Sequence, residues 1–527
     1  MSVQLCNIKT PVRIPRESLT DLDIFPLFKE FISAVYPLKD DDIESFINTY
    51  MTADINEILR RNEILYGLSK NAESKNLMAS VIGEYHRLSN SLSVLEGKPR
   101  PLMAATQMLN ALNAYISSID YFDNLFISGE VIEINKLAEF IQSQKSSAFY
   151  SQVRETLNQV NLLFKPLKNA TLAVNLRDSG DAVQIGVTNI NLGDNKLFGL
   201  FGNENERVNS LFNPVQVKLR SPLVHLEDFI LVQVEKQWAK PLSKTLRLLK
   251  KINKEILVIW MNWIRHIALY YLGLLLWDKL IKAGSMICKP ELCMEEMEAE
   301  SMQYPYLILS TVQAPIPQDF SLYSGDAVLI TGANGSGKTS TLKAFAQNCI
   351  LAQLGFWIPA KRFRFIPYHQ WFTVFSAGED NVMQTSRFQQ EAERMRLAIE
   401  IPSPQSTCLL LNEPFTSTNP VEASELLRDI IIQLNEKKMT LILVTHMYDI
   451  YHMLRKSIVS LRSYTTIAYA EAGKIIHTYS LVEKEPDGLS YARILAKEHK
   501  FSIGDLIQNQ DEARALELYL TGGETDA

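Results

Sequence analysis

The stretch AVLITGANGSGKTST, residues 327–341, has the pattern of a buried strand, a glycine-rich turn and the start of a helix. Residues 332–339 match G-x-x-x-x-G-K-[ST] at every fixed position, and in such a loop successive backbone N–H groups point at phosphate oxygens. Lys338 is expected to reach the terminal phosphates and the Thr339 hydroxyl to hold Mg²⁺. A chance glycine-rich turn is the weaker alternative, because the match is complete. The predicted nucleotide-binding residues of this loop are Gly332, Ala333, Asn334, Gly335, Ser336, Gly337, Lys338, Thr339 and Ser340.

The overall composition is that of an ordinary globular protein. The chain has 527 residues, of which 46% are hydrophobic and 21% charged, with a net charge of -6. An acidic total does not advertise nucleic-acid binding, although a local basic face remains compatible with it. An odd, scattered set of cysteines argues against a disulfide framework and for a reducing compartment, and the N-terminus has no apolar run of a signal peptide. We therefore expect a cytoplasmic protein. The cysteines are Cys6, Cys288, Cys293, Cys349 and Cys408.

One segment, LVIWMNWIRHIALYYLGLLLW at 257–277, is long and apolar enough to span a membrane. Arg265 and His266 lie near its centre, where charge is costly in lipid. We interpret the segment as a helix buried on most faces within a helical core, and we expect no membrane association.

The apolar pattern changes along the chain. Residues 1–165 show helical spacing. Residues 166–300 begin with two strand-like runs around the turn DSGD at 178–181, continue into long helices from His225 through Lys282, and end in a short acidic connector at 286–300. Residues 301–527 alternate strands and helices, which implies a sheet with helices on its faces. The predicted fold is an α-rich N-terminal region followed by a C-terminal α/β domain.

A basic strip lies in the expected long helices and recurs partly at helical spacing. It could face a phosphate backbone, or it could be a solvated helix face, and both interpretations stay open. Its members are Lys244, Arg247, Lys250, Lys251 and Lys254.

Two later strands end in residues that can complete an ATPase site. In the usual arrangement an Asp anchors Mg²⁺ and a following Glu orients the attacking water, but the strand TCLLLNE at 407–413 ends in Asn412 and Glu413. Asn412 offers a neutral oxygen in place of a carboxylate, so slow hydrolysis is expected. The strand LILVTH at 441–446 ends in His446, which can hydrogen-bond the γ-phosphate or the attacking water. The predicted catalytic residues are Lys338, Glu413 and His446, and the predicted Mg²⁺ ligands are Thr339, Asn412 and Glu413.

Ser386 precedes a helix that continues through Ile399. Its hydroxyl and the free N–H groups behind it would make a second phosphate site, better placed for a neighbouring subunit's nucleotide than for its own. Taken alone, Ser386 is a helix N-cap, and this alternative stays open.

In their order along the chain these motifs resemble the MutS family, the DNA mismatch-repair ATPases of the ABC superfamily. The resemblance is strong over about residues 300–510 and weaker upstream. It is carried by the phosphate loop GANGSGKTST, AQNCILAQLGFWIPA at 346–360, FTVFSAGED at 372–380, the signature-like Ser386-Arg387-Phe388 with Glu391, LLLNEPFTSTN at 409–419, Thr445-His446 and Ser490-Tyr491.

The resemblance implies a MutS-core-like helical region over residues 1–165, a small β-containing segment and lever helices over 166–300, and an ABC-type P-loop ATPase domain over 301–527. It also implies a homodimer with two composite ATP sites, each built from Lys338 of one subunit and Ser386 of the other. Asn419, in the dimer-contacting loop, is a further implied nucleotide-binding residue. ATP and Mg²⁺ are the implied cofactors. Double-stranded, mismatched or branched DNA is the implied partner, in DNA damage repair or recombination. The chain begins almost directly with core-like helices, so we expect the N-terminal mismatch-recognition domain to be missing.

Two other interpretations remain. In one, Asn412 leaves ATP bound but barely hydrolysed, and the protein is a nucleotide-gated switch that acts on a protein partner or on ribosomes. In the other, the chain is an ABC-type ATPase of the chromosome-maintenance kind, for which the missing long heptad runs are unfavourable.

Overall fold

The computed structural model shows two compact units, one formed by residues 1–5 and 67–268 and the other by residues 6–66 and 269–527. The domain boundaries near residues 165 and 300 stay predictions. The described residues are 3–7, 11–32, 39–164, 167–176, 182–192, 215–218, 235, 239–311, 314–376, 387–401, 406–416, 418–458, 460–471 and 474–486.

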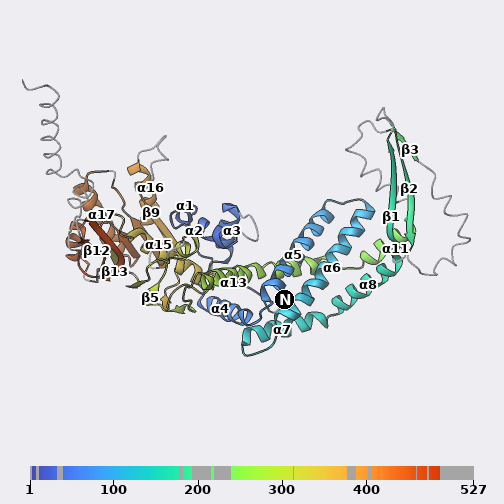
Figure 1. Ribbon diagram of the computed structural model, residues 1–527, viewed down its shortest axis with the longest axis horizontal. Helices are drawn as coiled ribbons and strands as arrows, with labels where there is room; N and C mark the ends of the chain where they lie inside the picture. Colours follow the sequence, from blue (N-terminus) through green and yellow to red (C-terminus); the bar gives the residue numbers. More distant parts are fainter. Residues whose placement is uncertain are drawn as a thin grey trace, which may run out of the picture. The chain divides into compact units, whose positions relative to one another are not determined.

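The first unit is α-rich, as expected. Its longest helices, α5 and α6, run side by side (Figure 1) and are separated by a short break that ends at Pro101, the first residue of α6. Aromatic side chains fill the core, and the buried Trp260 indole donates a 2.8 Å hydrogen bond to the Ser118 hydroxyl. The helices are α5 (Ser74–Glu96), α6 (Pro101–Leu125), α7 (Ile132–Lys145), α8 (Ala148–Phe164), α11 (Ala239–Leu249) and α12 (Lys254–Ile264), with α4 (Ile55–Lys70) shared between the units.

A β ribbon belongs to the same unit. Strand β1 (Leu167–Leu176) pairs antiparallel with β2 (Ala182–Leu192), which also pairs with β3 (Val215–Lys218). The two strand-like runs expected from the sequence are therefore confirmed, and the DSGD turn between them lies outside the described residues.

Two expectations for the middle of the chain are wrong. Segment 257–277 is not one helix but parts of two, α12 and α13 (Ile267–Lys282), which are separated at Arg265 and His266. No proline or glycine lies at this break, and the apolar composition of the segment is typical of a single continuous helix, which is why the break was not predicted. One face of α12 is buried through Leu257, Trp260 and Ile264, whereas Ile259 is 50% exposed. No described helix is long and apolar enough to cross a membrane.

The acidic stretch 286–300 is not a connector, because it contains β4 (Glu291–Leu292) and most of β5 (Glu296–Met302). Its glutamates alternate with apolar residues: Met297 and Ala299 are buried, while their acidic neighbours are more accessible. This period-two pattern is that of a strand with one buried face. Strand β5 lies in a four-stranded sheet of order β4-β8-β5-β6, with β8 at Arg362–Phe365 and β6 at Gln318–Tyr323.

The second unit contains a mixed α/β domain. Its six-stranded sheet has the order β13-β12-β7-β11-β10-β9, in which only the β12–β13 pair is antiparallel. Strands β7 and β11 are buried along their full length, as expected for the centre of a sheet covered on both faces. The elements are β7 (Ala327–Thr331), α15 (Lys338–Gln353), β9 (Gln370–Phe375), α16 (Arg387–Ile399), β10 (Thr407–Asn412), α17 (Pro420–Glu436), β11 (Thr440–Val444), α18 (Asp449–Arg455), β12 (Arg462–Glu471) and β13 (Lys474–Glu483).

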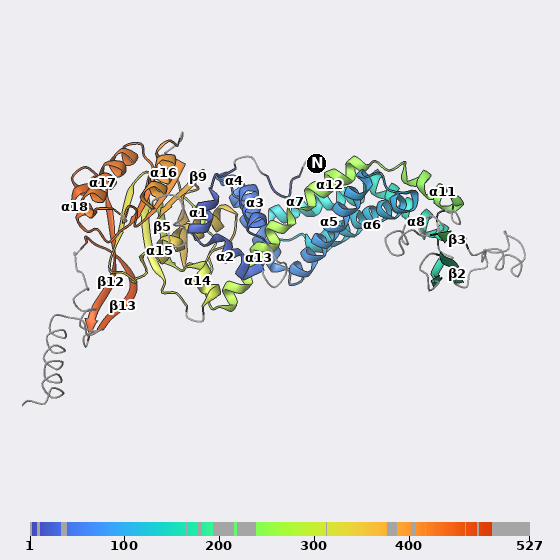
Figure 2. The same cartoon turned by 90° about the horizontal axis from the view of Figure 1, so that it is seen from above.

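The first helices of the chain, α1 (Arg16–Asp21), α2 (Ile24–Ile32) and α3 (Asp40–Tyr50), belong to this second unit. Helix α1 lies beside the edge strand β9 in both views (Figures 1 and 2). The Arg13 N–H donates to the His369 carbonyl and the Trp371 N–H donates to the Arg13 carbonyl, both at 2.9 Å. The N-terminal segment therefore continues the sheet edge, an arrangement that the sequence did not predict.

Candidate nucleotide-binding site

The phosphate loop joins β7 to α15, as the sequence predicted. Its glycines Gly332, Gly335 and Gly337 have φ values of +141°, +76° and +93°, a region that glycine enters freely. A Cβ on Gly332 would lie 1.9 Å from the Thr466 hydroxyl oxygen of the neighbouring strand β12. A side chain at this position would therefore push the loop away from the sheet.

Lys338 is the first residue of α15 and its side chain is only 4% exposed. Its ammonium group donates 3.0 Å hydrogen bonds to the carbonyls of Gly332 and Ala333. Burial lowers the pKa of Lys338, and the nearby Glu413 opposes that shift. A largely desolvated cation under a loop of backbone N–H groups is a strong attractor for an anion.

Strand ends bring the other predicted residues to the loop. The Thr339 hydroxyl donates a 2.9 Å hydrogen bond to the Asn412 side-chain oxygen at the end of β10. Glu413 follows, with one carboxylate oxygen 3.7 Å from the Lys338 nitrogen and the other 3.6 Å from the His446 Nδ1. The ends of β7, β10 and β11 meet because these strands are parallel neighbours, and in such sheets ligands bind at the carboxyl ends.

The charges at this centre influence one another. The contact with His446, and then the charge of Lys338, lower the pKa of Glu413 against the opposing effect of its burial. Glu413 in turn raises the pKa of His446. A carboxylate with a lowered pKa is ionised at neutral pH and can accept a proton, and a neighbouring imidazole can orient it.

The loop after β10 has an unusual backbone. Glu413 and Phe415 have φ values of +48° and +62° although neither is glycine, and a left-handed non-glycine residue costs roughly 1–2 kcal/mol. The Glu413 N–H donates to the Val444 carbonyl at 2.8 Å, and the Phe415 N–H donates to the Glu391 carboxyl at 2.6 Å. Sequence reasoning had noted Glu391 only within a signature-like motif and had assigned it no role.

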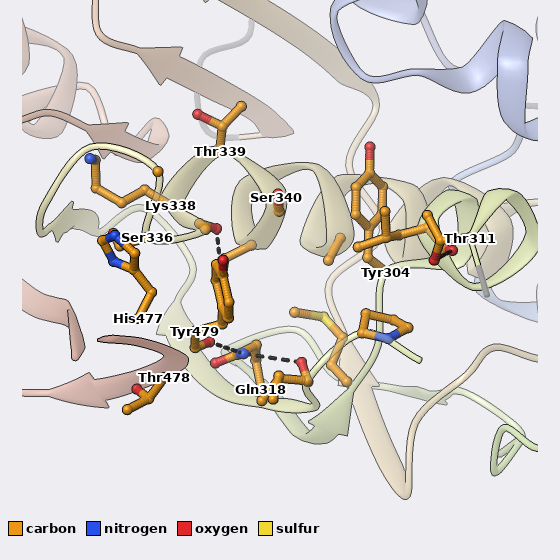
Figure 3. A pocket seen from close by; sticks show the side chains of 18 of the residues that line it. Tyr304, Thr311, Gln318, Ser336, Lys338, Thr339, Ser340, His477, Thr478 and Tyr479 are labelled. Atoms are coloured by element: carbon orange, nitrogen blue, oxygen red, sulfur yellow. Dashed lines mark hydrogen bonds between the residues drawn. The ribbon is translucent and has the colours of Figure 1, made fainter. Parts of the chain in front are cut away.

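A cavity of about 920 Å³ opens beside the phosphate loop. Figure 3 shows Lys338 and Ser336 at one end, Tyr304 and Thr311 at the other, and Tyr479 between them. Its volume is within the range of nucleotide-sized ligand sites. Sequence reasoning missed the lining residues Gln318, His477 and Tyr479, which come from the edge strands β6 and β13. His477 and the exposed Tyr479, two residues apart on one strand, were the available signal.

Gln318 fixes one wall of this cavity. Its amide nitrogen donates to the Tyr479 carbonyl at 2.5 Å, and its amide oxygen accepts the Leu481 N–H at 2.7 Å. Tyr479 has φ +55°, and its ring lies 3.4 Å from where a Cβ of Gly337 would be. Gln318 therefore holds an aromatic side chain next to the start of α15.

The remaining predicted residues divide into three groups. Asn334 and Ser340 line the cavity, and Ala333 contributes its carbonyl to Lys338. Asn419 is exposed and caps α17 by accepting the Val421 N–H at 2.9 Å, and the cavity lining does not include it. Ser386 lies outside the described residues.

The side chains next to Lys338 offer few ligands for a metal ion, which suits a metal that is also bound by the phosphates of a nucleotide. The described residues contain no cluster of three or more His, Cys, Asp or Glu side chains placed to hold a metal. Thr339 and Asn412 offer two neutral oxygens beside the Glu413 carboxylate. This set fits Mg²⁺, which commonly binds few protein ligands together with phosphate and water oxygens.

The five members of the basic strip are all exposed. They do not lie on one continuous helix, because α11 ends at Leu249 and α12 begins at Lys254. Both interpretations of this strip stay open.

Comparison with known proteins places these observations in a family. Residues 328–501 match the family model MutS domain V. The DNA mismatch repair protein MutS of Thermotoga petrophila is 21% identical over 84% of this chain and 57% of its own length. That of Thermotoga sp. (strain RQ2) is 20% identical over 80% of this chain and 55% of its own. The MutS of Geobacillus sp. is 28% identical over 34% of this chain and 21% of its own.

The matched part of this chain therefore spans no more than 57% of the length of these relatives. The domain V match covers the phosphate loop and the strand ends described above, and the two Thermotoga matches extend the similarity along most of the chain. Together these matches support the assignment of this chain to the MutS family.

Proposed function

We propose that this protein binds and hydrolyses ATP through a P-loop domain of the ABC type, and that it acts as a dimer whose nucleotide state controls DNA binding in repair or recombination. The observation that carries the proposal is the convergence of Lys338, Thr339, Asn412, Glu413 and His446 at the ends of three parallel strands. These residues come from three segments that lie far apart in the sequence, and they meet in the arrangement that phosphoryl-transfer sites use.

The phosphate loop would hold the nucleotide's phosphates through its backbone N–H groups and Lys338. Thr339 and Asn412 are placed to hold Mg²⁺, which supplies neutralisation of the phosphate charge when bound. The cavity between the loop and Tyr304 would take the base and ribose, with Tyr479 and Gln318 along one wall. Its mixed polar and aromatic lining suits a purine nucleoside.

Glu413 is the proposed general base. Its carboxylate is placed between Lys338 and His446, so it can accept a proton from water while His446 keeps it oriented. His446 is 47% exposed on its side chain, which leaves it able to contact a further oxygen of the reacting group. Transfer of a proton from water to Glu413 Oε1 or Oε2 leaves a hydroxide-like nucleophile. A phosphoryl-transfer site needs a residue that prepares the attacking water in this way.

The dimer and the DNA partner rest on the family. The relatives' names describe DNA mismatch repair, and we propose a related role on mismatched or branched duplex DNA. The trans-acting Ser386 and the contact loop at Asn419 stay part of this proposal. Asn419 is exposed in the single chain, which is compatible with a position in a subunit interface.

A second candidate function follows from Asn412. Its neutral oxygen accepts the Thr339 hydroxyl at 2.9 Å, where a carboxylate would also attract Mg²⁺ by charge. Weaker metal support favours slow turnover, so the protein would remain in its ATP-bound state and act as a nucleotide-gated switch on a protein or ribosome partner.

The test is ATP turnover by the purified protein, alone and with plain, mismatched or branched duplex DNA, beside a Lys338→Ala variant. We expect turnover that the variant lacks and that one DNA form stimulates. Undiminished turnover in Lys338→Ala would contradict the proposed site. Tight ATP binding with slow turnover that no DNA changes would favour the switch over the repair function.

A further inference from the structure

The loop that carries Glu413 is held in a conformation that its own residues do not favour. Two of three successive residues, Glu413 and Phe415, are left-handed without being glycine, and such residues persist only where the surroundings determine them. Strand pairing supplies one support, since the Glu413 N–H donates to the Val444 carbonyl. A second support must act at Phe415, where β10 has ended.

Glu391 provides that support. It lies in the second turn of α16 and is only 1% exposed. Its Oε2 accepts the Phe415 N–H at 2.6 Å, and one turn earlier the Phe388 ring lies 5.4 Å from the Phe415 ring. Helix and loop are thus joined by a hydrogen bond and by an aromatic contact. The buried Phe415 N–H thereby has an acceptor, which is the usual requirement for a polar group in a protein interior.

Helix α16 is held in place by polar contacts with α1 and β9, so the position of Glu391 on this helix is also held. The Arg394 guanidinium pairs with the Asp21 carboxylate of α1 and donates a 3.3 Å hydrogen bond to the Thr373 hydroxyl of β9. Thr373 also donates to Asp21 at 2.6 Å. This polar cluster fastens α16 to the edge strand and to the N-terminal segment, near which it lies in Figure 1.

We propose that Glu391 is a positioning residue for ATP hydrolysis, which holds the Asn412–Phe415 turn so that the Glu413 carboxylate stays between Lys338 and His446. This inference rests on the proposed ATPase function. Phe415 is two residues from Glu413, so the loop has little slack to absorb a movement at its anchor. Release of Phe415 lets the left-handed residues relax toward ordinary backbone conformations and moves the carboxylate away from the phosphate loop, while the loop's own glycines and Lys338 are unaffected.

The experiment measures ATP turnover and ATP affinity separately in three variants of the full chain. Glu391→Ala removes the acceptor, and Glu391→Gln keeps an acceptor oxygen on a side chain of the same length. Glu393→Ala is the matched control, because Glu393 lies two residues along the same helix, is exposed and pairs with Arg396. Affinity is read with a non-hydrolysable ATP analogue and folding by thermal unfolding.

We expect Glu391→Ala to lower kcat by roughly 10–100-fold, the effect of a displaced catalytic group, with an analogue Kd like that of the wild type. Glu391→Gln should retain most of the kcat, and Glu393→Ala all of it. A wild-type kcat in Glu391→Ala would overturn the inference. So would a parallel loss of kcat and analogue binding, which indicates general damage, or a Glu391→Gln variant as impaired as Glu391→Ala.

If Glu391→Ala does not fold, Glu391→Asp decides in its place, because it retracts the acceptor by one methylene and should lower kcat without weakening analogue binding. An unchanged kcat in a folded Glu391→Asp variant would then contradict the inference. The failure of the underlying function looks different. A wild-type protein without any ATP turnover refutes the proposed ATPase, whereas wild-type turnover with an unimpaired Glu391 variant refutes only the positioning role.

Discussion

Gly355→Ala tests how tightly the helix that begins at the phosphate loop is packed at its other end. Gly355 follows α15 with φ +86°, and its N–H donates to the Ala352 carbonyl at 2.9 Å. A Cβ there would lie 2.5 Å from the Arg61 Cβ. Arg61 cannot easily withdraw, because it is 1% exposed and its guanidinium donates to Glu57 at 2.8 Å.

The structure supplies a matched control for the backbone contribution. Gly284 follows α13 with φ +79°, and a Cβ there would meet nothing within 4 Å. For Gly284→Ala we expect only the left-handed penalty, roughly 1–2 kcal/mol. Gly355→Ala adds overpacking against a rigid neighbour, roughly 1–3 kcal/mol, so its total destabilisation should be about 2–5 kcal/mol.

Urea unfolding of the two variants and the wild type measures this difference, and hydrogen exchange of the α15 amides shows whether the loss is local to that helix. Both glycines lie in the same compact unit, so the comparison is direct. Equal destabilisation by the two substitutions would refute the reasoning, because it would mean that the Arg61 contact is absorbed without cost. A shift in the α15 amides only for Gly355→Ala would support it.

Three further outcomes follow from the structure. Asn412→Asp should raise ATP turnover by roughly tenfold through better metal support, measured as phosphate release at saturating Mg²⁺, and unchanged turnover would contradict the proposal that Asn412 slows hydrolysis. Backbone N–H groups lower the pKa of the Cys293 thiol, whereas burial raises the pKa of Cys288 to about 12. Brief iodoacetamide treatment near neutral pH should therefore alkylate Cys293 first, with the rate rising as pH approaches its pKa, and mass spectrometry that finds Cys288 labelled first would contradict this. Asp21→Ala should destabilise the protein by about 1–3 kcal/mol in urea unfolding because it leaves Arg394 without its charged partner, and a loss near zero would show that this partly buried pair contributes nothing.

The positions of the predicted phosphate-binding residues were predictable from local sequence. Glycines, Lys338 and Thr339 occupy adjacent positions whose geometry follows from the turn itself. Asn412, Glu413 and His446 could be placed because each ends an apolar strand, and parallel strands bring their ends to one edge. The assignment of roles to these residues remains a proposal, but their meeting at one edge is a property of the structure.

The walls of the cavity and the support of the loop that carries Glu413 were not predictable in this way. Gln318 and Tyr479 are 161 positions apart in the chain, and neither carries a motif. Glu391 accepts a hydrogen bond from the Phe415 N–H. The left-handed residues of that turn are not glycines, so the sequence gives no sign of their conformation. Such contacts depend on side-chain direction and on the packing of α16, which periodicity does not encode.

By itself the sequence determined the helical first part of the chain, the strand and helix alternation of the last part, and the phosphate loop, because each is a short-range pattern of glycines or of apolar spacing. Only the tertiary structure decided that the first helices of the chain cover the edge of the last domain's sheet, and that segment 257–277 is divided between two helices. For the first helices, the physical reason is that polar side chains such as Gln347 and Gln353 of α15 donate hydrogen bonds to the backbone carbonyls of Leu22 and Thr52. Long-range satisfaction of buried polar groups leaves no local signature in the chain.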